Sequence, residues 1–416
     1  MSKRKNQEQT LSKTKIKGQF MSKTRKKKII FFIDSLTEGG AERVISVLSR
    51  ELIHRNYDID VVMLYKRPIM YQLPKEVSLL YAEDMTVTSL YGRLVKKAFS
   101  IWSKIRFRIY IPLLRRLGYW KYPKANETSF YFYATYALPY REYLKRNSGA
   151  TAFGFLIRSN ISLLYAAKGT KVETVFCERN NPIRPDMPVN IMKLRDKIYS
   201  RCDKAVFQTE DERAYYKKLR CPTNVIPNPI KENLPDRYEG QRRHEIVNFC
   251  RLNKQKNIPL LIDAFEKLLV DYPDYTLRIY GNGEEKDNIS QYIRDKNMES
   301  SVILEEFKSN IHELIRDAGM FVSTSDFEGL SNSMLEAMAI GLPCLCTDCA
   351  GGGARMMIQD HQNGILVPVG DVEAVYQGMK EILDDKSLAE QLSKEASKIK
   401  EELNIQRITD EWEKMI

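Results

Sequence analysis

Residues 323–343 read STSDFEGLSNSMLEAMAIGLP. This stretch combines the end of a short apolar strand, a turn that contains Gly329, and a helix that begins near Ser331. The first amides of a helix have no partner within the helix, so they suit a phosphate. The stretch therefore predicts an α/β unit with an anion site at the carboxyl end of a strand. Taken alone, it is explained equally well by a glycine turn followed by an amphipathic helix that packs on its own sheet.

Short apolar strands alternate with helical periods on both sides of this stretch, which is typical of a doubly wound α/β sheet. The first strand is predicted over 28–33, a polar segment over 231–243 interrupts the pattern, and it restarts with a strand over 246–250. Two successive α/β sheets imply a cleft between them, where ligands bind at the carboxyl ends of the strands.

The predicted organisation has four parts. They are a basic disordered tail over 1–28, an N-terminal Rossmann-like domain over 29–229, a C-terminal Rossmann-like domain over 230–402, and a C-terminal helix over 403–416 that returns to the N-terminal domain. Residues Met21-Ser22-Lys23 repeat Met1-Ser2-Lys3, so the start of translation stays open between Met1 and Met21.

The composition is that of an ordinary globular protein, with 43% hydrophobic and 29% charged residues in a chain of 416. No apolar run approaches the roughly 20 residues of a membrane-spanning helix. The first run, 29–33, is too short for the core of a signal peptide. Seven cysteines do not indicate a disulfide framework in a chain of this length. We therefore expect a cytoplasmic protein.

The formal net charge of +12 is concentrated in two segments. Residues 1–28 hold eleven Lys and Arg with one acid, and residues 85–126 hold ten with no acid. The combined net positive charge of these two segments is larger than the net charge of the whole chain. The remaining residues together are therefore mildly acidic. No aromatic RNA-binding motif accompanies the charge, so we expect no nucleic acid as a partner.

The second basic segment also shows a helical period. Between residues 90 and 117, Leu94, Ala98, Ile101, Ile105 and Ile109 fall on one stripe and Arg93, Lys97, Lys104 and Arg108 on another. A basic helix with an apolar stripe suits an anionic membrane surface, at the inner face of a plasma membrane. A surface helix whose stripe packs on its own domain would show the same pattern, and the sequence leaves the two interpretations open.

A further motif follows the first strand of each predicted domain. Arg251 and Lys256 follow the strand 246–250, where two cations can neutralise a diphosphate. Gly39 and Gly40 follow the strand 28–33, where glycines let the backbone approach a ligand closely. Each motif alone is also an ordinary surface loop or turn.

The three motifs together resemble the family 4 glycosyltransferases, which have the GT-B fold. The Glu-x7-Glu pattern matches Glu328 and Glu336, and the Arg-Leu-x3-Lys-Asn pattern matches 251–257. Residues 39–43 are similar to the family's N-terminal glycine loop, and 225–230 to its interdomain segment. The fold class implied is α/β, with two Rossmann-like doubly wound domains that face a central cleft.

The resemblance implies a retaining transfer of a sugar from a nucleotide-sugar, usually UDP-linked. The catalytic residues carried over are Glu328, which contacts the sugar hydroxyls, and Arg251 and Lys256, which hold the diphosphate. The donor-binding residues carried over are Gly39, Gly40, Phe307, Gly329, Leu330, Ser331, Asn332 and Glu336. Cations and helix amides then stabilise the leaving diphosphate, so neither a cofactor nor a divalent metal is expected.

Residues 176–182 resemble the Glu-Arg-Asn segment of bacterial transferases that build capsule, O-antigen or other surface glycans. Glu178, Arg179 and Asn180 are therefore the acceptor-side candidates, although a strand-end ion pair would explain them too. The expected partners are a nucleotide-sugar (UDP-hexose or UDP-N-acetylhexosamine), a lipid-linked oligosaccharide acceptor and an anionic membrane surface.

Two alternatives remain open at this point. One is a nucleotide-sugar epimerase, or a phosphorylase with pyridoxal phosphate on a lysine, on the same fold. The other is a non-catalytic scaffold for polysaccharide assembly. A metal site at Cys344, Cys346 and Cys349 is rejected, because these cysteines fall on a predicted buried strand and no fourth ligand is evident.

Overall fold

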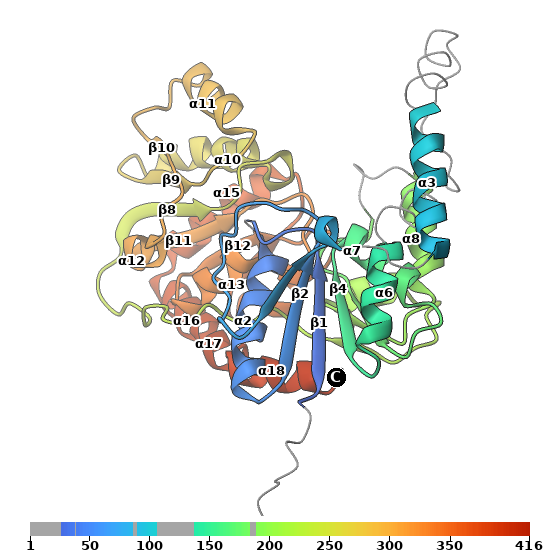
Figure 1. The fold of residues 1–416 in the computed structure, drawn as a ribbon. Coiled ribbons are helices and arrows are strands. Elements are labelled where there is room, and N and C mark those ends of the chain that lie inside the picture. The colour runs from blue at the N-terminus through green and yellow to red at the C-terminus, as the bar shows by residue number, and fades with distance from the viewer. Residues whose placement is uncertain (1–25, 38, 86–89, 106–136, 184–188) are drawn as a thin grey trace, which may run out of the picture.

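The structure of the chain is a computed structural model, and it describes residues 26–37, 39–85, 90–105, 137–183 and 189–416. These residues form two parallel β-sheets, each flanked by helices (Figure 1). The tail before residue 26, a strand predicted near 129–133 and the basic segment beyond residue 105 lie outside the described residues. Within those ranges, no helix is both long enough and apolar enough to cross a membrane.

The first sheet has seven strands in the order β3-β2-β1-β4-β5-β6-β7. Its order reverses direction between β1 and β4, and folds of this kind bind ligands beside the loops that follow two such strands. The strands are β1 (Lys28–Ile33), β2 (Asp58–Met63), β3 (Ser78–Tyr81), β4 (Thr151–Phe155), β5 (Glu173–Cys177), β6 (Lys204–Phe207) and β7 (Thr223–Val225). The helices are α2 (Gly40–His54), α3 (Leu90–Ile105), α6 (Leu138–Arg146), α7 (Ile157–Ala167), α8 (Val189–Tyr199) and α9 (Glu210–Tyr215).

The second sheet has six strands in the order β10-β9-β8-β11-β12-β13, and its order reverses between β8 and β11. The strands are β8 (Arg243–Phe249), β9 (Thr276–Tyr280), β10 (Val302–Glu305), β11 (Ala318–Ser323), β12 (Cys344–Thr347) and β13 (Ile365–Val367). The helices are α10 (Ile258–Asp271), α11 (Lys286–Asp295), α12 (Ile311–Ile315), α13 (Asn332–Ala339), α14 (Gly353–Met357), α15 (Val372–Asp384), α16 (Lys386–Ser397), α17 (Ile399–Glu402) and α18 (Ile405–Glu413).

The last helix, α18, lies against the first sheet unit although it follows the second in the chain (Figure 1). Its Trp412 is fully buried and packs on the rings of Phe153 and Phe155, with ring centroids 5.6 and 5.7 Å away. On the outer side, Arg55, the residue after α2, pairs with Asp410 and Glu413. The aromatic contact at its core fixes the end of the chain to β4.

One buried apolar cluster runs from the first unit into the second. It joins Phe31 of β1 to Phe321 of β11 through Ile226 and Ile230 of the connecting segment, and Leu330 of the turn after β11 also belongs to it. Because burial of apolar surface is the main stabilising term in folding, this shared cluster favours a fixed arrangement of the two units.

The predicted fold class, two Rossmann-like α/β units, is confirmed. The short strands β3 and β13 were not predicted. Both lie at an edge of their sheet and hold only four and three residues.

Candidate functional site

The predicted site residues come from loops that follow the strands of the two sheets. In the first unit, Gly39 and Gly40 follow β1 and Asn180 follows β5. In the second, Lys256 follows β8 and Glu328 follows β11, the two strands that flank the reversal of strand order. Parallel strands end at the same edge of a sheet, so these loops gather where such folds bind ligands.

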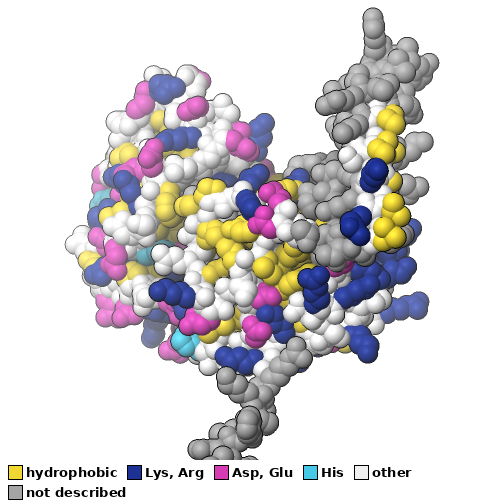
Figure 2. Space-filling view, in the orientation of Figure 1, with side chains coloured by type: hydrophobic (Ala, Val, Ile, Leu, Met, Phe, Trp, Pro, Cys, Tyr) yellow, Lys and Arg dark blue, Asp and Glu magenta, His cyan; other side chains and the backbone are white. Residues whose placement is uncertain are grey.

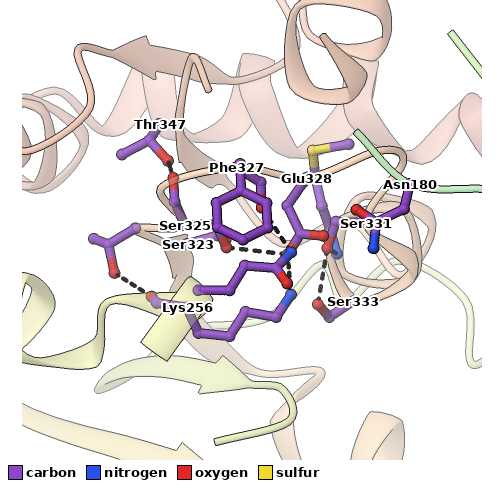
Figure 3. Close-up of polar contacts among 12 residues, drawn as sticks. Asn180, Lys256, Ser323, Ser325, Phe327, Glu328, Ser331, Ser333 and Thr347 are labelled. Carbon is purple, nitrogen blue, oxygen red and sulfur yellow. Dashed lines mark hydrogen bonds and ion pairs between the residues drawn. The ribbon is translucent and has the colours of Figure 1, made fainter. Parts of the chain in front are cut away.

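The centre of the site is an ion pair between Lys256 and Glu328. Figure 3 shows the two side chains pointing toward one another, with Nζ of Lys256 donating to Oε1 of Glu328. The hydroxyl of Ser325 also donates to Oε1 of Glu328, at 3.2 Å. The side chains of the pair are only 14% and 16% exposed. Burial by itself would lower the pKa of Lys256, but the negative charge of Glu328 outweighs it and raises the pKa, so the lysine stays charged.

The turn that carries Lys256 is held by hydrogen bonds to the turn that carries Glu328. A single 3₁₀ turn over Lys254–Lys256 ends at Asn257, which has a left-handed φ of 44°. Nδ2 of Asn257 donates to Oδ1 of Asp326 at 2.8 Å, and Nε2 of Gln255 donates to the carbonyl of Phe327 at 2.6 Å. These contacts position the ion pair through side chains that the sequence analysis did not single out.

The helix that follows Glu328 begins as predicted, with Ser331 as its N-cap. The amide of Met334 donates to Oγ of Ser331 at 3.4 Å. Asn332, the first residue of α13, accepts at its Oδ1 a hydrogen bond of 2.8 Å from Nδ2 of Asn228. A Cβ atom at Gly40 would lie 3.0 Å from Nδ2 of Asn332, so the glycine loop after β1 faces the start of α13 at close range.

Glu336 connects the two units. Its Oε1 accepts a hydrogen bond from Nη1 of Arg43 on α2 at 2.7 Å, and its Oε2 lies 2.7 Å from Nε2 of His312 on α12. Arg43 also donates to the carbonyl of Pro229 at 2.9 Å. Burial would raise the pKa of Glu336, but the hydrogen bond from His312 and the charge of Arg43 outweigh it and lower the pKa. Glu336 is therefore a carboxylate with protein partners on both oxygens.

His312 is a further residue of the site that was not predicted from the sequence. This residue is 5% exposed and lies edge-on to the ring of Phe249, at 5.8 Å. It is 24 residues before its partner Glu336. No periodicity or motif marks it, because only the packing of α12 beside α13 brings the two together.

Arg251 is exposed, unlike Lys256. Its positive charge acts on Glu42, in the first turn of α2 of the first unit. Burial raises the pKa of Glu42 to about 7, and the charge of Arg251 limits this rise. A Cβ atom at Gly39 would meet the Glu42 carboxylate, so only glycine leaves room for that carboxylate there.

Glu178 and Arg179 are buried at the end of β5. Oε2 of Glu178 accepts a hydrogen bond of 2.6 Å from the hydroxyl of Tyr216. The guanidinium of Arg179 lies 5.7 Å from the ring of Trp412 and donates to Oδ1 of Asn228, and burial lowers its pKa. The backbone of Asn180 lies against Gly329 of the second unit. Of these three acceptor-side candidates, Asn180 is the one beside the Glu328 turn (Figure 3).

Two polar residues that the sequence analysis missed face the same turn. A Cβ atom at Gly329 would lie 2.7 Å from Oε1 of Gln208 and 2.8 Å from Oε1 of Glu212, so both side chains end close to the backbone of Gly329. Burial, and then the charge of Glu178, raise the pKa of Glu212 well above its usual value. Phe307, in contrast, lies in the loop after β10 and is 65% exposed.

Among the residues that the structure describes, no group of three or more His, Cys, Asp or Glu side chains is placed to hold a metal ion. Burial raises the pKa of the thiols of Cys344, Cys346 and Cys349, which are free cysteines on and after β12. Buried neutral thiols of this kind pack as small apolar side chains.

Comparisons with known proteins agree with this geometry. Residues 231–399 match the model of the family "Glycosyl transferases group 1". The chain is 28% identical over 382 residues to N-acetylgalactosamine-N,N'-diacetylbacillosaminyl-diphospho-undecaprenol 4-alpha-N-acetylgalactosaminyltransferase of Campylobacter jejuni, covering 87% of this chain and 91% of the relative. It is 26% identical over 213 residues to an uncharacterized glycosyltransferase of Haemophilus influenzae, and this match covers 51% of the chain and 60% of that relative's length.

A solved structure of similar fold is that of HepE of Anabaena in complex with UDP and glucose, with a TM-score of 0.69 at 15% identity over 93% of this chain and 98% of the other. The residues that match the family model include both the Arg251–Asn257 turn and the Glu328–Glu336 segment. Residues 231–399 therefore resemble the group 1 glycosyltransferases, and the chain has the GT-B fold that its motifs predicted.

Proposed function

We propose that this protein is a retaining glycosyltransferase of bacterial surface polysaccharide biosynthesis. It transfers a hexose or N-acetylhexosamine from a UDP-linked donor to a lipid-linked oligosaccharide. The bond broken joins the anomeric carbon of the sugar to the diphosphate, and the bond formed joins that carbon to a hydroxyl of the acceptor.

The observation that carries the proposal is the pair of Lys256 and Glu328 at the reversal of strand order. A lysine that stays charged in a half-enclosed site supplies a fixed positive charge for a leaving diphosphate, whose negative charge grows in the transition state. Glu328 offers acceptor oxygens to sugar hydroxyls within reach of the same lysine. The N-terminal amides of α13 and the exposed cation Arg251 complete the anion site.

The choice of donor and acceptor rests on the similar proteins. HepE, with the same fold, binds UDP and glucose in its solved structure. The Campylobacter jejuni relative, which this chain matches over most of its length, is named for transfer of N-acetylgalactosamine to a glycan on diphospho-undecaprenol. We assign the same classes of donor and acceptor to this chain, with the acceptor meeting the first unit near Asn180.

We further propose that the protein works at an anionic membrane surface, because its acceptor is attached to a lipid. Helix α3 supports this part of the proposal. Figure 2 shows apolar and basic side chains side by side along α3, which extends away from the two sheets (Figure 1). Leu90, Leu94, Ile101 and Ile105 are each more than half exposed, and Arg93 and Lys97 are exposed beside them. The rest of the basic segment, 106–126, lies outside the described residues.

The test is an assay of purified full-length protein with UDP-glucose, UDP-galactose, UDP-N-acetylglucosamine and UDP-N-acetylgalactosamine, together with a membrane extract that contains polyprenyl-linked glycans. We expect one donor to release UDP and to pass its labelled sugar into the lipid fraction. Lys256→Met should abolish this transfer, while Lys254→Met, in the same turn but exposed, should retain it. Proton NMR of the product should show the anomeric configuration of the donor.

Other outcomes would replace the proposal. Conversion of a UDP-sugar to its epimer without release of UDP would identify an epimerase. No turnover of any donor would favour the non-catalytic scaffold. A product of inverted anomeric configuration would overturn the retaining mechanism. We also propose that no divalent metal is needed, and turnover that stops in EDTA and returns with Mg²⁺ or Mn²⁺ would contradict this.

A further inference from the structure

We propose that Cys202 and Cys221 form a redox-active dithiol, which a hydroperoxide converts to an intramolecular disulfide. The two sulfur atoms lie 3.3 Å apart, closer than an ordinary contact of two unbonded sulfurs, and both thiols are reduced in the structure. This site is independent of the glycosyltransferase site, so the proposal does not rest on the proposed function.

The backbone around the two cysteines already holds them together. Cys202 ends the turn before β6, and Cys221 ends the turn before β7. The two strands are parallel neighbours, with Ala205 opposite Thr223, and the amide of Ala205 donates to the carbonyl of Pro222 at 3.0 Å. A bond between the sulfurs therefore needs them to approach by little more than 1 Å, since a disulfide is about 2 Å long.

The two thiols differ in the way that a peroxide-reactive pair requires. Cys221 is half-buried and Cys202 is 8% exposed, so a small oxidant in solution reaches Cys221 first. The hydrogen bond between the two thiols lowers the pKa of Cys221, whereas the same contact raises the pKa of Cys202. Because the thiolate is the reactive form, Cys221 is the attacking group and Cys202 the resolving one.

The chemistry balances with the peroxide alone as oxidant. The thiolate of Cys221 attacks one peroxide oxygen, the O–O bond breaks, and hydroxide leaves, which gives a sulfenic acid on Cys221. The sulfur of Cys202 then attacks the Cys221 sulfur, the S–O bond breaks, and the hydroxyl leaves as water with the proton of Cys202. Two thiols are oxidised and one hydrogen peroxide is reduced to water.

The segment enclosed by the bond contacts the second unit. Between the two cysteines, Oγ1 of Thr209 donates to the carbonyl of Gly351 at 2.6 Å, and Asp211 pairs with Arg355 at 3.3 Å. Both cysteines precede their strands, so they lie at the edge of the sheet opposite the cleft. The disulfide would thus join the two ends of a chain segment whose middle part contacts the second unit.

The other cysteines of the chain provide the contrast. Cys250, also half-buried, has its pKa raised by burial to about 12, so little of it is thiolate at neutral pH. The remaining four are buried. Oxidation of the folded protein should therefore be selective for the one pair.

The test treats the purified, reduced full chain with hydrogen peroxide, blocks the remaining thiols with iodoacetamide, and measures mass and cross-linked peptides. We expect two of the seven thiols to be lost, a peptide pair that joins Cys202 to Cys221, and full reversal by dithiothreitol. Cys202→Ser should stop at a sulfenic acid on Cys221 that dimedone traps. Cys250→Ser, the matched control, should still lose two thiols.

Two results would overturn the proposal. One is an equal loss of thiols in the wild type and in the Cys202→Ser/Cys221→Ser double variant, which would place the oxidation elsewhere. The other is a linked peptide that contains a different cysteine. The circular dichroism spectrum of each variant, compared with that of the wild type, shows whether it has folded before it is scored.

Discussion

Arg43 of α2 and Glu336 of α13 form an ion pair of 2.7 Å that joins the two sheet units. Both side chains are 12% exposed, and His312 occupies the second oxygen of the carboxylate. The two residues are 293 positions apart in the chain and belong to two of the motifs that resemble those of the family 4 glycosyltransferases. Glu336, which we expect to contact the donor, thus also connects the two units. The first unit carries the glycine loop, and the second carries the Lys256–Glu328 pair.

Replacing Arg43 with methionine should destabilise the protein, because the carboxylate of Glu336 loses its cationic partner in a buried place. Removing one partner of a buried ion pair lowers the free energy of unfolding by about 3 kcal/mol or more. Urea denaturation measures this change. Arg50→Met is the matched control on the same helix, since Arg50 pairs with Glu232 at an exposed site and its loss should lower the free energy by less than about 1 kcal/mol.

A double-mutant cycle shows whether the effect belongs to the pair. Glu336→Gln removes the charge that Arg43 balances, so the double variant should lose less stability than the two single variants together. Additive losses would mean that Arg43 acts through packing alone. Equal losses in Arg43→Met and Arg50→Met would contradict the assignment of a buried interdomain ion pair.

Lys256→Met should weaken the binding of UDP much more than Lys254→Met. A hydrogen bond to a charged group contributes about 1.5 to 3 kcal/mol, so the dissociation constant should rise roughly tenfold to a hundredfold in the first variant. Lys254 lies two residues away, in the same 3₁₀ turn, but its side chain is exposed, and it is Lys256 that pairs with Glu328. Isothermal titration of both variants with UDP gives the comparison. Equal dissociation constants would remove Lys256 from the diphosphate site.

The sequence predicted the parts of the site that depend on strand ends. Lys256 and Glu328 follow strands of one parallel sheet, so the alternation of strands and helices suffices to place them at one edge. It did not predict that they pair with one another, which depends on the 3₁₀ turn and on Asn257 with its positive φ.

Contacts between the units could not be predicted. His312 and Glu212 lie within an α-helix as ordinary polar residues, and nothing in their neighbours distinguishes them from exposed side chains. Their burial arises from the way the second unit packs against the first and from the packing of α12 beside α13. Such contacts between distant segments have no period or local motif, so a single sequence does not contain their signal.

Glu42 should make the binding of UDP depend on pH. Its pKa of about 7 means that the carboxyl is mostly neutral at pH 6 and mostly charged at pH 8, beside the Gly39 backbone where we expect the donor phosphates. A negative charge there repels a diphosphate, so affinity should fall as pH rises. A repulsion on the order of 1 kcal/mol corresponds to about a fivefold change in the dissociation constant.

The measurement is the dissociation constant of UDP at pH 6 and pH 8 for the wild type and for Glu42→Gln. UDP itself titrates in this range, so the informative quantity is the difference between the two proteins. Glu51→Gln, on the same helix but remote from the glycine loop, should follow the wild type. If Glu42→Gln shows the same pH dependence as the wild type, the carboxyl does not face the diphosphate.

Helix α3 should bind vesicles that contain anionic lipid. An exposed apolar stripe with basic residues beside it combines insertion at the lipid surface with attraction of about 1 kcal/mol for each Lys or Arg. Leu94→Ser/Ile101→Ser should therefore reduce binding of the full chain to vesicles of phosphatidylglycerol and phosphatidylcholine, measured by flotation. Val270→Ser is the matched control, because Val270 is an apolar side chain on α10 that is 84% exposed, and its loss should leave binding unchanged.

The same vesicles separate a membrane contact from the packing of α3 on its own domain. Lys97→Gln should weaken binding about fivefold at low salt, and the difference should shrink as salt screens the charge. Binding to phosphatidylcholine alone should be weak, because it lacks the anionic headgroup. If Leu94→Ser/Ile101→Ser lowers the free energy of unfolding but leaves vesicle binding intact, the stripe serves the fold and a different surface meets the lipid.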